Sequence, residues 1–208
     1  MQRLRVSVLG GSGYVGGELL RLVLGHPRLQ LGQVSSRRWA GTPLHRVLPQ
    51  MPLDAQSRFV HPDEMEEADV LVLALPHGES MRLWPRVKHL APIIIDMGAD
   101  FRLKDPGQFA RWYGQEHLCP EALDGFVYGL PEVNGESLVG ATRVACPGCN
   151  ATAAILALWP LSQAGFLDRS HTVIQILGSS SQAGRQPSQA AHFSERAGSV
   201  RVFAPQEH

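Results

Sequence analysis

The stretch LRVSVLGGSGYVGGELLRLVL, residues 4–24, places an apolar segment, a glycine-rich turn and a second apolar segment in direct succession. Residues 4–9 have the composition of a buried strand, and in residues 18–24 the leucines and Val23 recur at helical spacing. Gly10, Gly13 and Gly16 allow a tight turn whose backbone N–H groups, at the start of a helix, can approach a pyrophosphate. This succession predicts a dinucleotide-binding turn. The alternative is a glycine-rich turn with a purely structural role.

The segments that follow alternate between strand-like and helix-like patterns. Strand candidates are 29–34, the continuous apolar run 69–75, and 93–96, and a helix candidate spans 79–90 despite its proline. Strands and helices that alternate at these lengths predict an α/β fold with a Rossmann-like, doubly wound parallel sheet. Residues 103–140 are richer in Gly, Pro and charge, and we expect loops with short elements there.

Composition limits the classes of function. The chain has 208 residues, 44% of them hydrophobic, and 19 basic side chains balance 19 acidic ones. Because the overall charge is balanced and no stretch approaches about 18 apolar residues, we expect neither nucleic-acid binding nor a membrane span. A cytoplasmic location is the default expectation. Three cysteines do not make a disulfide framework, and a reducing compartment would keep them as thiols.

A basic turn follows the second predicted strand. In NAD-binding sheets an Asp or Glu at this place accepts hydrogen bonds from the adenine ribose, whereas here the chain reads Ser35-Ser36-Arg37-Arg38. Two hydroxyl and two guanidinium groups make a pocket for a 2′-phosphate, which arginine binds through charge-assisted hydrogen bonds. The turn therefore favours NADP as the cofactor. A solvated basic turn is the alternative.

Two thiols lie close together in ACPGCNAT, residues 145–152. Because residues 143–146 look like a strand end and 151–158 are strong helix formers, we expect Cys149 at a helix amino terminus, where unpaired N–H groups and the dipole favour a thiolate. Cys146, before the Pro-Gly turn, lacks that advantage. A redox CxxC pair is an alternative, although such a pair normally follows the first strand of a small domain. A zinc site would need His117 and Cys119 as a second ligand pair, and their spacing is poor for it.

A thiolate beside a bound nicotinamide has a direct chemical use. It can attack an activated acyl group and expel the leaving group, which we expect to be phosphate. Hydride reduction of the resulting thioester then gives an aldehyde.

Several ordered blocks resemble one enzyme family over essentially the whole chain. The blocks are GGSGYVGGELLRL (10–22), SSRRWAG (35–41), LALPHGES (73–80), IIDMGADFRL (94–103), VYGLPE (127–132), PGCNAT (147–152) and SSSQAGRQPS (179–188). As an ordered set they resemble the N-acetyl-γ-glutamyl-phosphate reductases, which are relatives of aspartate-semialdehyde dehydrogenase. The set is far more specific than a single glycine turn.

The resemblance implies roles for individual residues. Cys149 would be the nucleophile, and Arg102 and Asn150 would lie in the substrate region. The cofactor phosphates would lie at Ser12, Gly13, Tyr14 and Val15, the 2′-phosphate near Ser35 and Arg38, and the nicotinamide beside Pro76, His77 and Gly78. For Arg102 the alternative is an ion pair with Asp96 or Asp100, and for His77 it is a residue that only starts a helix.

The cysteine block also implies a substrate class. Arginine-pathway members usually read Pro-Gly-Cys-Tyr-Pro-Thr, whereas PGCNAT resembles the lysine-pathway branch. That branch reduces aminoadipate 6-phosphate attached to a small acidic amino-group carrier protein of the LysW type. The resemblance thus implies a carrier-bound acyl phosphate in lysine biosynthesis, with N-acetylglutamyl phosphate in arginine biosynthesis as the alternative. It also implies a homo-oligomer.

The domain boundary is expected in the Pro-Gly turn. Residues 1–148 would form an NADP-binding domain, and residues 149–208 the first part of an α+β catalytic and dimerisation domain. Family members carry a His-Arg-His block that supplies the acid/base histidine, and they continue well beyond it. His208 falls where the first histidine of that block is expected, so it is the candidate acid/base or a neighbour of it. A truncated NADP-binding protein without catalysis is a further alternative.

Overall fold

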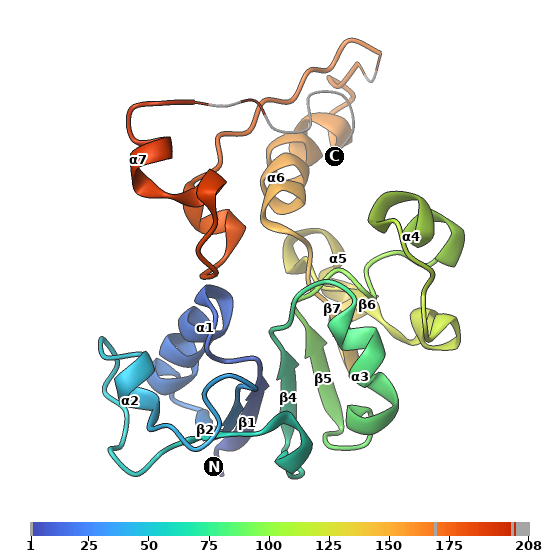
Figure 1. Ribbon diagram of the computed structural model, residues 1–208. Helices are drawn as coiled ribbons and strands as arrows, with labels where there is room; N and C mark the ends of the chain where they lie inside the picture. Colours follow the sequence, from blue (N-terminus) through green and yellow to red (C-terminus); the bar gives the residue numbers. More distant parts are fainter. Residues whose placement is uncertain (1, 169, 201, 203–208) are drawn as a thin grey trace. The chain divides into compact units, whose positions relative to one another are not determined.

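The structure is a computed structural model that describes residues 2–168, 170–200 and 202 (Figure 1). The chain divides into two compact units, Met1–Ile174 and Gln175–His208. The first unit contains the sheet and the predicted nucleotide turn, and the second contains short helical turns joined by loops.

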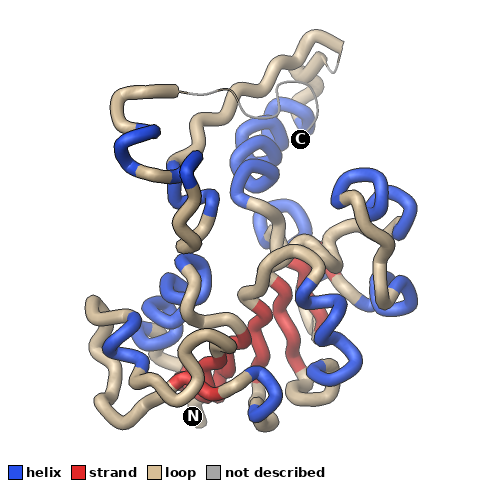
Figure 2. The backbone as a smooth tube through the Cα atoms, in the orientation of Figure 1, coloured by secondary structure: helices blue, strands red, loops and turns tan. Residues whose placement is uncertain are grey.

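A parallel sheet forms the centre of the first unit (Figure 2). Within the described residues its seven strands lie in the order β3-β2-β1-β4-β5-β7-β6, and every neighbouring pair is parallel. The strands are β1 (Leu4–Leu9), β2 (Leu29–Ser35), β3 (Phe59–Val60), β4 (Val70–Leu73), β5 (Ile93–Asp96), β6 (Val127–Tyr128) and β7 (Arg143–Ala145). The strand order reverses direction between β1 and β4, which is where doubly wound sheets bind ligands. The predicted Rossmann-like sheet is confirmed.

Helices and 3-10 turns follow the strands of the sheet, and most of them connect one strand to the next. They are α1 (Tyr14–Gly25), α2 (Leu44–Val47), α3 (Glu79–Val87), α4 (Pro106–Tyr113), α5 (Pro131–Leu138) and α6 (Cys149–Gln163), with the 3-10 turns η1 (Pro62–Glu64) and η2 (Pro120–Gly125). Helix α1 starts at Tyr14, four residues before the predicted segment that begins at Glu18. Its first turn contains Gly16 and Gly17, which carry no apolar pattern and are held in the helix by close packing. The stretch 103–140, expected as loops with short elements, holds α4, η2, β6 and α5.

Alternating side chains on the central strands bury two faces of the sheet. Val8 of β1 packs in a cluster with Leu20 of α1 and with α2. Its neighbour Leu9 points to the opposite face, into a larger cluster with Met81 and Trp84 of α3. Since the strand alternation sends α1 and α3 to opposite faces, the loops that precede both helices meet at one edge of the sheet, the carboxyl ends of the strands.

Helix α3 continues through Pro85 because its lost hydrogen bond is replaced. Proline has no N–H to donate to the carbonyl four residues earlier, which is that of Met81. The Cys119 thiol donates to that carbonyl instead, at 3.2 Å. Buried Cys119 is therefore part of the packing around α3.

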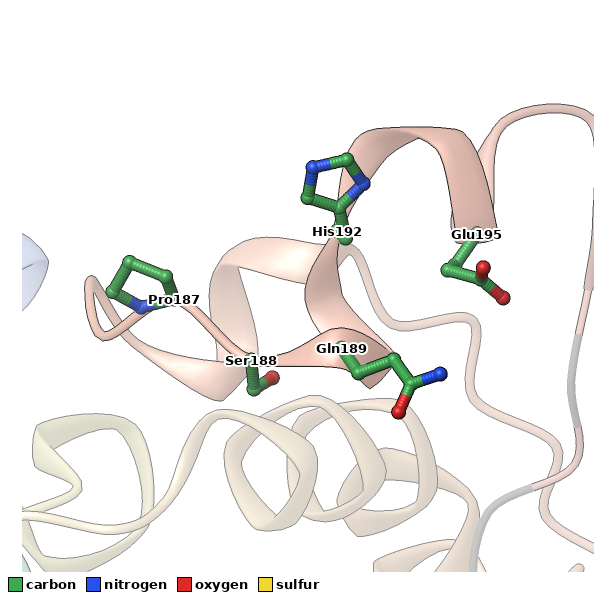
Figure 3. A pocket seen from close by; sticks show the side chains of 5 residues that line it. All are labelled: Pro187, Ser188, Gln189, His192 and Glu195. Atoms are coloured by element: carbon green, nitrogen blue, oxygen red, sulfur yellow. The ribbon is translucent and has the colours of Figure 1, made fainter.

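The second unit contains η3 (Ser180–Ala183), η4 (Gln189–Ala191) and α7 (Phe193–Arg196). Figure 3 shows a shallow pocket within it, of about 350 Å³, lined by Pro187, Ser188, Gln189, His192 and Glu195. The Ser188 side chain caps η4 by accepting a hydrogen bond from the Ala191 N–H.

Candidate active site

The turn between β1 and α1 has the shape that its glycines require. Gly10 has a φ of 87°, and a Cβ on Gly16 would lie 2.7 Å from Gly11 Cα, closer than non-bonded atoms approach. Only glycine at position 16 lets the first turn of α1 close onto the loop. Gly13 caps α1 without a side-chain hydrogen bond, and the first turn carries no acidic side chain. The start of α1 therefore fits an anion such as the pyrophosphate of a dinucleotide.

The loop after β2 is tied to this turn by two serines. Ser35 is fully buried, and the Gly10 N–H donates to its Oγ at 3.2 Å. Ser36 Oγ lies 2.9 Å from Ser12 Oγ. These hydroxyl groups hold the glycine turn against the end of β2, while the next two residues, Arg37 and Arg38, are exposed.

Three further side chains flank this corner of the sheet. Tyr14 and Val15 begin α1 and are exposed. The Arg38 guanidinium lies over the Trp39 ring, 5.0 Å from its centroid. The side chains predicted to hold the adenine half of a cofactor therefore come together at the carboxyl ends of β1 and β2.

The loop between β4 and α3 is fixed by a buried carboxylate. Pro76 and His77 are exposed, and Gly78 has a φ of 85°. Asp100, fully buried, accepts the Gly78 N–H at 2.7 Å and the Met81 N–H at 2.9 Å. Asp100 thus caps the start of α3 from the loop after β5.

His77 lies where these loops converge. Its ring is 5.6 Å from that of Tyr113. Burial lowers the pKa of His77, and the nearby Arg102 charge lowers it further. The lowered pKa favours the neutral form of the imidazole, which can donate or accept a hydrogen bond.

Arg102 holds the loop that leads to the predicted nucleophile. Its Nε donates to the Cys146 carbonyl at 2.7 Å, and its Nη2 donates to the Met97 carbonyl at 3.0 Å. Its Nη1 makes no hydrogen bond to any described residue. This nitrogen lies beside Gly148, where a Cβ added to the glycine would be 3.2 Å from Nη1. No described ion pair joins Arg102 to Asp96 or Asp100, so the alternative of a simple salt bridge is not what the structure has.

The two thiols of the loop differ in exposure. Cys149 is the first residue of α6 and is exposed, and its Sγ lies 3.8 Å from Asn150 Oδ1. Cys146 is half-buried. Burial raises the pKa of its thiol, and the nearby Asp96 charge raises it further. No disulfide joins Cys119, Cys146 or Cys149 to another cysteine in the described part of the chain. The candidate acid/base His208 lies outside the described residues.

A second buried acid, Asp96, was considered in the sequence only as a possible partner of Arg102 and not as part of the site. Asp96 ends β5 with no exposed surface, and its Oδ1 accepts hydrogen bonds from Ser80 Oγ at 2.6 Å and from the Gly98 N–H at 3.2 Å. Oδ2 has no partner among the described residues. The available signal was IIIDMGAD, residues 93–100, in which two acids follow a buried strand at the edge where sites form.

Neither a metal-binding cluster nor a membrane-spanning helix is found in the described part of the chain. There, no group of three or more His, Cys, Asp and Glu side chains is arranged to hold a metal ion. None of the helices described is long and apolar enough to cross a membrane.

Comparison with known proteins places the chain in a family. Residues 5–141 match the family described as semialdehyde dehydrogenase, NAD binding domain, and residues 149–208 match the one described as semialdehyde dehydrogenase, dimerisation domain. A LysW-L-2-aminoadipate 6-phosphate reductase of Deinococcus radiodurans is 47% identical over 98% of this chain and 58% of its own length. An N-acetyl-gamma-glutamyl-phosphate reductase of Halorhodospira halophila is 40% identical over 99% of this chain and 60% of its own length. The chain thus spans about three fifths of these curated relatives.

The fold agrees with this match. Aspartate semialdehyde dehydrogenase II from Vibrio cholerae, in a crystal structure complexed with ASA, superposes with a TM-score of 0.63 at 17% identity and covers 92% of this chain and 50% of that one. At that identity the likeness concerns the fold alone. On the family matches, the chain belongs to the semialdehyde dehydrogenase family and contains its NAD(P)-binding domain.

Proposed function

We propose that the chain carries the cofactor site and nucleophile of an NADPH-dependent acyl-phosphate reductase. The observation that carries the proposal is the position of Arg102. Its Nε donates to the Cys146 carbonyl in the loop that leads to Cys149, its Nη2 donates to the Met97 carbonyl in the loop after β5, and its Nη1, beside Gly148, can donate to a substrate oxygen. A guanidinium group beside Gly148, the residue that precedes the exposed Cys149, suits an acyl phosphate, because it can bind the phosphate while the thiol attacks the acyl carbon.

Residues of the first unit would hold the cofactor. The glycine turn, with Ser12, Gly13, Tyr14 and Val15 at the start of α1, would bind the pyrophosphate. Arg38, with the serines that shape its loop, would bind the 2′-phosphate, and Pro76 and His77 would border the nicotinamide. When bound there, NADPH supplies the hydride that the reduction needs.

The chain's own groups account for the remaining steps. The Cys149 thiolate attacks the acyl carbon, a C–S bond forms, and the C–O bond to phosphate breaks. Arg102 stabilises the charge on the departing inorganic phosphate. After hydride reaches the thioester carbonyl carbon, the C–S bond breaks, Cys149 leaves as thiolate and the semialdehyde is released. His208 is our candidate for the group that moves a proton to and from the carbonyl oxygen.

The proposed substrate is aminoadipate 6-phosphate on a small acidic carrier protein. The 47% identical Deinococcus radiodurans relative is named for that substrate, and the resemblance of PGCNAT to the lysine-pathway branch supports the same choice. N-acetylglutamyl phosphate is the second candidate, because a 40% identical relative is named for it. We also propose a homo-oligomer, since residues 149–208 match a dimerisation domain.

A direct comparison of the two acyl phosphates tests the proposal. With NADPH present, we expect oxidation of NADPH with the carrier-bound aminoadipyl phosphate, and slower oxidation as salt screens the acidic carrier from basic side chains. Equal or faster turnover of free N-acetylglutamyl phosphate would favour the arginine-pathway substrate. NADPH binding without reaction of either acyl phosphate would favour a non-catalytic NADP-binding protein.

A further inference from the structure

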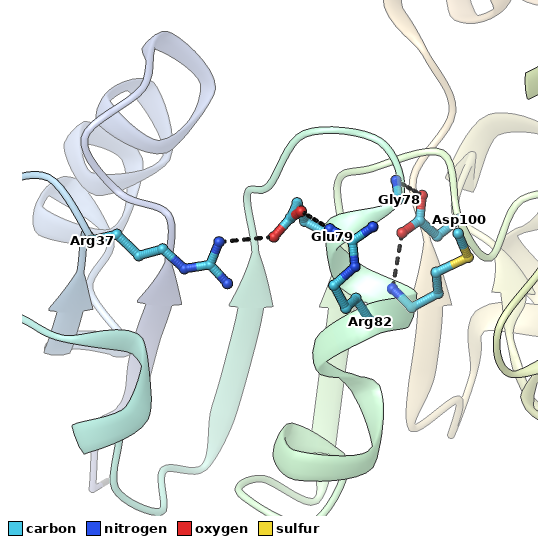
Figure 4. A network of polar contacts seen from close by, with 6 residues as sticks. Arg37, Gly78, Glu79, Arg82 and Asp100 are labelled. Carbon is cyan, nitrogen blue, oxygen red and sulfur yellow. Dashed lines mark hydrogen bonds and ion pairs between the residues drawn. The ribbon is translucent and has the colours of Figure 1, made fainter. Parts of the chain in front are cut away.

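A carboxylate holds Arg37, which precedes Arg38 in the basic turn where the 2′-phosphate site is proposed. Arg37 Nη1 donates to Glu79 Oε2 at 3.1 Å, and Arg82 Nη1 donates to Glu79 Oε1 at 2.5 Å (Figure 4). Arg37 lies in the loop after β2, whereas Glu79 is the first residue of α3, after β4. In the sheet, β1 lies between β2 and β4. The ion pair therefore spans the end of β1, which carries the glycine turn.

The side chain of Glu79 is more restrained by its surroundings than that of Arg37. The Glu79 side chain is 22% exposed, receives two guanidinium groups and sits on the helix start that buried Asp100 caps. The Arg37 side chain is 58% exposed. Because Glu79 is fixed by α3 and by Arg82, Arg37 is the partner that can move.

We propose that Glu79 is a specificity-determining residue for the cofactor, because it competes with the 2′-phosphate for Arg37. The inference rests on the proposed NADP site. A phosphate monoester carries up to about two negative charges near neutral pH and accepts bidentate hydrogen bonds, so it can take Arg37 from a single carboxylate. Arg82 stays on Glu79 when Arg37 leaves, which lowers the energy needed to break the pair. Glu79 then recaptures Arg37 as the cofactor dissociates, so it weakens the retention of NADP(H) and leaves NAD(H) unaffected.

The test is a titration of the 208-residue chain with NADPH and with NADH by calorimetry. Glu79→Gln keeps the shape of the side chain and removes its charge, and we expect it to tighten NADPH by about twofold to fivefold, the range of an exposed ion pair. NADH binding should change less than NADPH binding. In an Arg37→Gln background, Glu79→Gln should have no effect on NADPH, because the contested guanidinium group is gone.

Glu18→Gln is the matched control for a simple change of charge. Glu18 lies in α1 beside the glycine turn and pairs with Arg21 three residues later at 2.5 Å, as Glu79 pairs with Arg82. It should not change the ratio of NADPH to NADH affinity.

Three results would overturn the inference. The first is weaker NADPH binding by Glu79→Gln, which would mean that the ion pair prepares Arg37 for the phosphate. The second is unchanged NADPH binding by that variant. The third is equal tightening of NADPH binding by Glu79→Gln with and without Arg37. A wild-type chain that binds NADPH no better than NADH would overturn the cofactor assignment itself, and the inference with it.

Discussion

At the scale of single residues, burial gives similar groups different properties. Cys146 and Cys149 are separated by two residues, yet burial raises the pKa of the first thiol while the second is exposed at a helix start. Asp96 ends β5 and Asp100 lies in the loop that follows, yet Asp100 has both oxygens bonded to backbone N–H groups and Asp96 has one oxygen without a partner among described residues. The sequence shows which residue types are present but not these environments.

Asp96 should make stability depend on pH. Burial, together with the nearby Asp100 charge, outweighs the hydrogen bond from Ser80 and raises the pKa of Asp96 from 3.8 to about 6. Between roughly pH 4 and pH 6 the folded chain keeps a proton that the unfolded chain has lost, so the stability from this group falls as pH rises, by about 3 kcal/mol in total. Asp96→Asn does not titrate, so its stability relative to wild type should rise between about pH 4 and pH 7. Denaturant unfolding at both pH values measures this, and a difference that stays constant would contradict it.

Arg38 should discriminate between the two nicotinamide cofactors. A charge-assisted hydrogen bond contributes about 1.5–3 kcal/mol, so Arg38→Gln should weaken NADPH by roughly tenfold to a hundredfold and barely change NADH. Arg28→Gln is the control, because Arg28 precedes β2 whereas Arg38 follows it. Titration with both cofactors decides the point. Equal losses for NADPH and NADH in Arg38→Gln would refute the 2′-phosphate assignment.

At the scale of elements, helix starts organise the site. The amino termini of α1, α3 and α6 follow β1, β4 and β7, and each begins after a glycine: Gly13, Gly78 or Gly148. Among the described residues, no side-chain cap hydrogen bond is found at the starts of α1 and α6, whereas at the start of α3 Asp100 accepts hydrogen bonds from two backbone N–H groups. Because Asp100 already binds the N–H groups at the start of α3, the starts of α1 and α6 are the ones that can bind an anionic ligand.

Two glycines of α1 provide a matched test of the nucleotide turn. A Cβ on Gly16 would meet Gly11 and Gly10 backbone atoms at 2.7–2.9 Å, whereas a Cβ on Gly25 would meet nothing within 4 Å. We expect Gly16→Ala to destabilise the fold by about 1–3 kcal/mol and to weaken NADPH. Gly25→Ala should leave stability unchanged or raise it by up to about 1 kcal/mol. Thermal unfolding and cofactor titration check both, and similar effects from the two substitutions would contradict the packing argument.

The sequence predicted long, regular elements well and short ones poorly. Strands β1 and β5 have the predicted bounds, because continuous apolar runs between turns mark them. Strands β3 and β6, of two residues each, were missed because so short a segment has no periodicity to detect. Helix α3 was predicted to reach Leu90 and ends at Val87. The predicted boundary between 148 and 149 stays a prediction.

At the scale of the whole molecule, the fold collects residues that lie far apart in the chain. Parallel strands bring the loops after β1, β4, β5 and β7 to one edge, so that Gly10, His77, Arg102 and Cys149 belong to one region of the first unit. From the sequence, these residues could be assigned roles by resemblance. The role of Asp100, which caps the start of α3, and the pairing of Glu79 with Arg37 could not be predicted, because both depend on contacts between residues far apart in the chain.

The central claim is that Cys149 alone carries the acyl group, and mass spectrometry of the chain treated with acyl phosphate in the absence of NADPH tests it most directly. We expect an acyl adduct on Cys149, none on Cys146 or Cys119, loss of the adduct in Cys149→Ser and its retention in Cys146→Ala. The exposed thiol at the start of α6 can reach the substrate, whereas Cys146 is half-buried with a raised pKa. An adduct on Cys146, or a disulfide between Cys146 and Cys149 that follows activity, would contradict the account.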